Sequence, residues 1–207
     1  TVLDDVIFTN YDLPLLESML KNKNFWVRQF IITYIARIHT KEAQHALIRA
    51  MTDYDPDVRG TISANLETFE FTSNEIPLLV KNLSAPQKDM IIFAMKFLAA
   101  IDSPEVSDIL IPYLNDFSWK LRKAAMFQLY GRKFTEKQLI ELGELLNNDY
   151  YSDVLSRKYI AFVLGGSSNP IALKALEERL EHEDYLSLAR GTIKEAIKKI
   201  KERTRTN

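Results

Sequence analysis

The sequence predicts an all-α protein, a single domain of about six antiparallel helix pairs. Two independent columns, one of large apolar residues and one of mostly apolar residues, each repeat every 31 to 35 residues. The segments between them carry apolar residues at helical spacing. Gly (6) and Pro (7) are scarce for an all-β protein of 207 residues. The columns are Leu20, Met51, Leu83, Leu114, Leu146 and Leu180, then Val27, Val58, Met90, Leu121, Ser156 and Ala189.

The first helix of each pair, helix A, is short and ends at the first column. Pro14 and Pro77 each precede their column leucine by six residues, which suits the first turn of a helix. Pro112 lies inside the fourth A helix and predicts a kink. The predicted A helices are Asp12–Leu20, Glu42–Met51, Glu75–Leu83, Val106–Leu114, Gln138–Leu146 and Ile171–Leu180.

The second helix, helix B, begins near the second column and is longer. Its apolar residues lie at offsets 0, 4, 8 and 11 from the column residue, which is one stripe of a helix. A stripe of this kind needs a neighbouring surface to cover it, and the next pair supplies one. Offset +4 holds Ile31, Ile62, Ala94, Ala125, Ile160 and Ile193, and offset +8 holds Ile35, Leu66, Leu98, Leu129, Leu164 and Ile197.

Helix-start signals agree with this count. Asp55, Ser103 and Asn169 each precede a proline, as N-caps do. Thr72 with Glu75, and Thr135 with Gln138, have capping-box spacing. The predicted units within 1–207 are 12–40, 41–71, 72–102, 103–133, 134–167 and 168–203.

Composition excludes several classes of protein. The net charge of −1 disfavours a generic nucleic-acid binder. The absence of Cys removes disulfides, thiolate metal sites and cysteine nucleophiles. His39, His45 and His182 show no triad or metal spacing, so we expect no catalytic residues, no metal and no cofactor. No apolar run approaches the length of a membrane span, and we expect a cytoplasmic protein or the soluble domain of a larger one.

The starts of the B helices resemble a known family. Arg follows the column residue in five units, and Asp55-Pro-Asp57-Val58-Arg59 is closest to the family phrase. The third unit departs, with Met90-Ile91. The sequence resembles the HEAT-repeat family, in particular the short bacterial HEAT-like repeats named from phycobilin lyases. The resemblance implies a right-handed α-solenoid with the B helices on its concave face. It also implies that the Asp and Arg tie adjacent repeats together.

The arginine column therefore has two interpretations. It forms inter-repeat hydrogen bonds at the edge of the apolar stripe, or it is an anion-binding ladder, since guanidinium groups suit carboxylates and phosphates. We expect the structural role. The residues concerned are Arg28, Asp55, Arg59, Arg122, Arg157 and Arg190.

A candidate binding surface lies opposite the apolar stripe, at offsets +2, +6 and +9. In the first two units these positions are small or polar, but the middle units place large apolar side chains and lysines there. We expect a protein or peptide partner that is partly acidic. The alternative is that Phe127 and Phe162 pack sideways between B helices. The candidates are Ile92, Lys96, Lys123, Phe127, Tyr130, Lys158 and Phe162.

Two further features allow a binding or a structural role. Aromatic residues precede the B helices, where they stack on a ligand or wedge the turns of adjacent repeats. The last helix is rich in Lys and Arg, as a docking surface or a solvated cap would be. The aromatic residues are Phe25, Trp26, Tyr54, Phe117, Trp119, Tyr150, Tyr151 and Tyr185.

The leading hypothesis for function is a noncatalytic scaffold that grips a protein or peptide with its middle B helices. The alternative is a HEAT-like DNA glycosylase acting on alkylated bases, with the lysines and aromatics lining a DNA channel. A bilin lyase-type chaperone rests on the family resemblance alone. The sequence leaves the partner's identity and the oligomeric state open.

The start of the chain suggests a piece of a longer protein. Thr1 is not an initiator methionine, and Leu3, Val6 and Ile7 match the end of a preceding B helix if the period extends backward. The alternative is an ordinary N-terminal arm.

Overall fold

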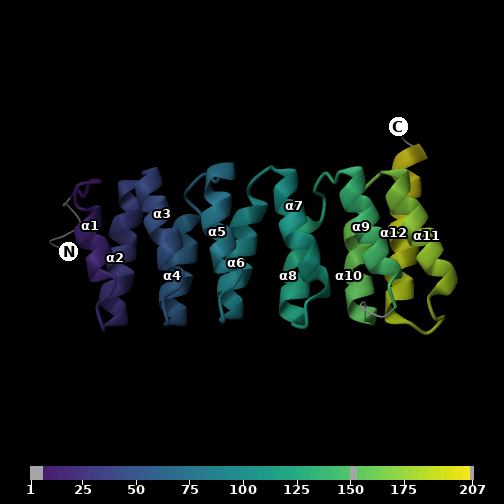
Figure 1. The fold of residues 1–207 in the computed structure, drawn as a ribbon, viewed down its shortest axis with the longest axis horizontal. Coiled ribbons are helices and arrows are strands. Elements are labelled where there is room, and N and C mark those ends of the chain that lie inside the picture. The colour runs from purple at the N-terminus through teal and green to yellow at the C-terminus, as the bar shows by residue number, and fades with distance from the viewer. Residues whose placement is uncertain (1–6, 150–152, 206–207) are drawn as a thin grey trace. The chain divides into compact units, whose positions relative to one another are not determined.

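The computed structural model describes residues 7–149 and 153–205 and is all-helical over these residues, with no strand. Twelve α-helices alternate between A and B helices along the described chain (Figure 1). The helices fall into two compact units, of which the first ends at Ala100 and the second begins at Ile101.

The first unit contains three helix pairs. The A helices α1 (Leu13–Met19), α3 (Lys41–Ala50) and α5 (Ile76–Asn82) alternate with the B helices α2 (Phe25–Ile38), α4 (Pro56–Leu66) and α6 (Lys88–Ala99). A short 3₁₀-helix, η1 (Ser73–Glu75), leads into α5. Within this unit α2 packs against both α4 and α3, so successive pairs lie side by side.

The second unit contains the other three pairs. Its A helices are α7 (Pro104–Leu110), α9 (Glu136–Asn147) and α11 (Pro170–His182), and its B helices are α8 (Trp119–Leu129), α10 (Val154–Leu164) and α12 (Leu188–Arg205). Helix α10 packs beside α8 on one side and α12 on the other, and α9 runs along α11. The six predicted helix pairs are therefore all present.

The core of each unit is the apolar stripe of its B helices. All twelve residues at offsets +4 and +8 are buried, beginning with Ile31 and Ile35 in α2. The column leucines and Met51 at the ends of the A helices pack onto the same stripe from the other layer, and most are also buried. Burial of these side chains supplies the main driving force for stacking.

Helix starts follow the predicted signals with two differences. Asp55 and Asn169 cap their helices, Pro14 and Pro77 lie in first turns, and both capping boxes form. Ser103 occupies the N-cap position of α7 without a side-chain cap hydrogen bond. The predicted kink at Pro112 is instead a change of helix type: α7 ends at Leu110 and η2 (Ile111–Asn115) continues as a 3₁₀-helix. Proline has no N–H for the next α-helical hydrogen bond, which explains the change.

Candidate functional site

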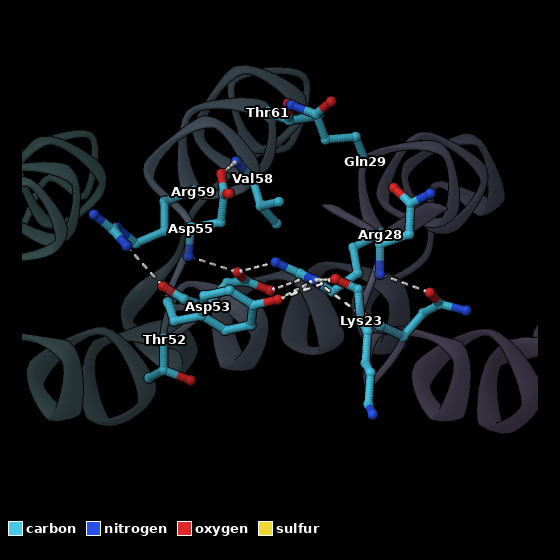
Figure 2. A network of polar contacts seen from close by, with 12 residues as sticks. Lys23, Arg28, Gln29, Thr52, Asp53, Asp55, Val58, Arg59 and Thr61 are labelled. Carbon is cyan, nitrogen blue, oxygen red and sulfur yellow. Dashed lines mark hydrogen bonds and ion pairs between the residues drawn. The ribbon is translucent and has the colours of Figure 1, made fainter. Parts of the chain in front are cut away.

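Arg28 links the first two repeats. Its side chain is 1% exposed, and its Nε and Nη2 donate hydrogen bonds of 2.7 and 2.9 Å to the carboxylate of Asp53 (Figure 2). Nη1 donates to the carbonyl of Asn22 at 2.8 Å and to the Tyr54 hydroxyl at 2.7 Å. The hydrogen bond to Asp53, opposed by burial, raises the pKa of the Arg28 guanidinium. The guanidinium thus joins the A–B turn of its own repeat to the A–B turn of the next repeat.

The same arrangement recurs at two other arginines, Arg59 and Arg122. Arg59 donates to Asp89 at 2.7 and 2.9 Å and to the carbonyl of Asp53 at 2.8 Å. Arg122 donates to the carbonyl of Asp116 at 2.6 Å and lies 3.4 Å from the Asp153 carboxylate. In each case the carbonyl lies six residues before the arginine and the carboxylate belongs to the next repeat.

Arg157 belongs to a cluster of charged side chains in the second unit, with Arg179 and Glu183. It donates to Glu183 at 3.0 Å, and Arg179 donates to the same carboxylate at 2.6 Å. Burial raises the pKa of the Glu183 carboxyl, but hydrogen bonds from Ser187, Arg157 and Arg179 outweigh burial and lower it overall. The carboxylate, whose side chain is fully buried, therefore stays ionised.

Two members of the predicted structural set act differently. The Asp55 carboxylate accepts hydrogen bonds from the N–H groups of Asp57 and Val58, so it caps α4, and Asp53 is the residue that meets Arg28. The guanidinium of Arg190 donates to the carbonyls of Leu180 and Glu183 in its own repeat. Sequence spacing could not separate two aspartates that lie two residues apart.

The predicted partner-binding residues lie in different units. Ile92 and Lys96 are on α6 in the first unit, where Ile92 is half-buried and Lys96 is ion-paired with Glu67. The other five are in the second unit: Lys123 and Phe127 on α8, Tyr130 at its C-cap, and Lys158 and Phe162 on α10. The ion pair at Lys96 leaves that side chain less free to meet an acidic ligand.

Helix α8 exposes an aromatic and lysine stripe. Phe127 is 57% exposed, and the Nζ of Lys123 lies 5.8 Å from the centroid of its ring. Tyr130 extends the stripe and touches Phe162 of α10, with ring centroids 4.5 Å apart. Phe162 is half-buried and Lys158 is exposed. The sideways packing considered for both phenylalanines describes Phe162 and not the outward-facing Phe127.

Neither Trp119 nor Val154 was predicted as part of the binding surface, and Trp119 was grouped only with the aromatic residues that precede the B helices. Trp119 is 53% exposed and stands four residues before Lys123, and Val154 stands four before Lys158. Residues four apart share a helix face, so offset −2 joins the stripe. Extending the +2 and +6 pattern backward by one helical turn would have found both residues.

Other exposed aromatics line the A–B turns. The ring centroid of Tyr54 lies 4.3 Å from the Cζ of Arg28, and the rings of Phe25 and Trp26 are tilted by 34° with their centroids 4.6 Å apart. Both Trp26 and Phe30 are more than half exposed and border a groove of about 250 Å³ with Thr61. Phe117 and Tyr185 are also exposed, while Tyr150 and Tyr151 lie outside the described residues, as do Leu3 and Val6.

A larger cleft of about 700 Å³ opens in the first unit between α1 and α3. Its lining includes the apolar Ile32, Val58 and Ile62 and the ion pair of Glu17 with Arg49, 2.6 Å apart. In the described part of the chain, no three acidic or histidine side chains are grouped so that they could hold a metal ion. Among those same residues, no helix has both the length and the apolar character needed to cross a bilayer.

Three lysines of α12 pair with acidic side chains. Lys199 pairs with Glu195 at 3.7 Å and Lys198 with Glu202 at 3.9 Å, both within the helix. Lys201 reaches Glu177 of α11 at 2.6 Å. These exposed pairs are typical of a solvated helix face.

Comparison with solved structures agrees with the architecture. Human deoxyhypusine hydroxylase in complex with glycerol matches with a TM-score of 0.54 and 17% identity, over 93% of this chain and 74% of that one. A designed armadillo repeat protein in complex with the peptide (KR)4 matches with a TM-score of 0.51 and 17% identity, over 91% and 99% of the two chains. An engineered protein also matches, with a TM-score of 0.51 and 17% identity over 92% and 97%.

The chain has the fold of a helical-repeat protein. The resemblance to HEAT-like repeats is therefore confirmed at the level of the fold. No protein-family model matches the chain, and no curated protein sequence matches it either. The matched structures include an enzyme and designed scaffolds, so they share an architecture and no single activity.

Proposed function

We propose that the protein is a noncatalytic scaffold that binds an acidic segment of another protein on the B-helix face of its second unit. The observation that carries the proposal is the exposed stripe of Trp119, Lys123 and Phe127 on α8, repeated on α10 at the same offsets. We call these two stripes, together with Tyr130 at the C-cap of α8, the α8–α10 face. It comprises Trp119, Lys123, Phe127, Tyr130, Val154, Lys158 and Phe162.

The chemistry of the α8–α10 face favours a ligand with both apolar and acidic groups. Exposed rings gain free energy when a partner covers them, and aromatic residues are enriched at binding hot spots. Within the described residues, no carboxylate is ion-paired with Lys123 or Lys158. The carboxylates of a partner would form ion pairs with both lysines, so charge complementarity favours an acidic ligand.

The packed helices also limit the cost of binding. The backbone of α8 is fixed by the buried Leu121, Ala125 and Leu129 on its opposite side. A face that is already ordered loses little conformational freedom on association.

Selection from a random peptide library displayed on phage tests the proposal. We expect the intact protein to enrich sequences with Glu or Asp beside apolar residues. The double variant Lys123→Glu with Phe127→Ser should lose this enrichment. Ile140→Ser is the matched control, because Ile140 is 51% exposed on the A helix α9.

Three results would overturn the proposal. The first is enrichment of basic peptides, and the second is equal enrichment by the double variant. The third is tight binding of duplex DNA at moderate salt that survives the double substitution, which would support the nucleic-acid alternative.

A further inference from the structure

The α8–α10 face is organised in three rows that run from one helix to the next. Residues at equal offsets in successive repeats occupy equivalent positions, and α8 packs beside α10. The equivalent residues on α8 and α10 are Trp119 and Val154 at offset −2, Lys123 and Lys158 at offset +2, and Phe127 and Phe162 at offset +6. A row of lysines therefore lies between two rows of apolar side chains.

The spacing of the rows follows from helix geometry. Four residues rise about 6 Å along a helix, so each apolar row is about 6 Å from the lysine row. Packed helix axes are about 8–10 Å apart, which sets the spacing between the two lysine positions along their row. A ligand lying across the helices thus meets a positive charge about every 9 Å, with apolar surface on both sides.

The rows end at α12. Offset +2 there is Gly191, and offset +6 is Glu195, which pairs with Lys199 at 3.7 Å. No positive charge continues the lysine row, and a carboxylate replaces the phenylalanine in the next row. The face therefore accepts a short ligand segment that spans two helices.

We propose that the ligand segment binds across α8 and α10 in the polyproline II conformation, with an acidic residue at every third position and apolar residues at the other two. This proposal rests on the proposed function. Polyproline II has three residues per turn and rises about 3.1 Å per residue, so every third side chain returns to one face after about 9 Å. That repeat equals the spacing of the lysine row.

Other backbone conformations fit the rows less well. A β-strand returns a side chain to the same face every second residue, after about 6.7 Å, which is out of step with the lysines. The three residues per turn of polyproline II also place the other two sets of side chains on two further faces of the ligand, and each of these faces can contact one apolar row. A preformed polyproline II segment loses less entropy on binding than a flexible chain.

Fluorescence polarisation with two labelled peptides tests the proposal. The first is a Glu-Pro-Leu repeat, and the second is an isomer of the same composition with its glutamates adjacent. We expect the isomer to bind about fivefold more weakly. Lys123→Gln and Lys158→Gln should each weaken the repeat peptide about threefold, as loss of one exposed charge pair does. Lys137→Gln on α9 changes the same charge away from the face and should have no effect.

The outcome separates this proposal from the proposed function. Equal binding of the two isomers would overturn the polyproline II register, while library selection of acidic peptides would still support the α8–α10 face. Tighter binding of a helical peptide with glutamates seven residues apart would also overturn it. If neither the labelled peptides nor any acidic peptide from the library bound, both the polyproline II proposal and the proposed function would be wrong.

Discussion

The guanidinium of Arg28 and the carboxylate of Asp53 are joined by two hydrogen bonds of 2.7 and 2.9 Å, although 25 residues separate them in the sequence. The arginine begins a B helix and the aspartate lies in the A–B turn of the next repeat. Arg28 also donates to the carbonyl of Asn22 in the A–B turn of its own repeat. One side chain therefore satisfies groups in two successive repeats.

Replacing Arg28 should strongly destabilise the first unit. Arg28→Ala leaves the Asp53 carboxylate, only 11% exposed, without its counter-charge. Breaking a buried pair from one side costs about 3 kcal/mol. Urea denaturation followed by circular dichroism measures the loss. Arg49→Ala breaks the exposed pair with Glu17 and should cost less than about 1 kcal/mol. Equal costs for the two variants would contradict the structural role of Arg28.

Glu183 should make the stability of the second unit fall in acid. Its folded-state pKa is lowered, so its contribution is complete above the ordinary pKa of about 4.3 and is lost as pH falls through the folded-state value. Glu183→Gln should flatten the dependence of the unfolding free energy on pH below that point. The exposed Glu178→Gln is the control, and urea midpoints across the acid range are the measurement. An unchanged slope in Glu183→Gln would contradict the assignment.

The two phenylalanines of the α8–α10 face should respond differently to substitution. Phe127→Ser should change the unfolding free energy by less than about 0.5 kcal/mol, because the ring is mostly in solvent. Phe162→Ser loses the contact with Tyr130 and should cost more than about 1 kcal/mol. Thermal denaturation compares the two, and peptide binding is measured on the same samples. A large loss of stability in Phe127→Ser would show that this ring packs rather than binds.

Two glycines in the last repeats should give opposite results when changed to alanine. A Cβ at Gly165 would lie 2.8 Å from the Cβ of Ala196, so Gly165→Ala should separate α10 from α12 and cost about 1–3 kcal/mol. Gly191 lies in α12 with nothing within 4 Å of such a Cβ. Gly191→Ala should stabilise the helix by about 0.5–1 kcal/mol. Denaturation midpoints that move in the same direction would contradict this account of the α10–α12 contact.

The helix pairs could be predicted because their signals are local. The stripe at offsets +4 and +8 needs only the helical period, and the column residues repeat often enough to fix the number of pairs. The change to a 3₁₀-helix at Pro112 was harder to predict, since proline in a helix produces either a kink or a break. The separation into two compact units depends on contacts between helices, which no local pattern encodes.

The candidate site could be predicted only in part. Lys123 and Phe127 could be predicted as candidates because their helical positions follow directly from the column residue. The ion pair of Lys96 with Glu67 and the ring contact of Tyr130 with Phe162 join different helices, so they require the packed structure. The role of Asp53 as the partner of Arg28 also requires the packed structure, because Asp55 lies two residues away and has the stronger N-cap signal.

The arginine contacts restrict how the hairpins could be rearranged. Arg28 meets a carboxylate in a turn, at Asp53, whereas Arg59 meets one within the first turn of a B helix, at Asp89. The two neighbours therefore present their acids at different places. In a chimera that exchanged the second and third hairpins, Arg28 would face Asp89 on a helix instead of a carboxylate in a turn. The order of the modules is thus encoded in the chain, and this solenoid cannot be shuffled freely in the way that identical consensus repeats can.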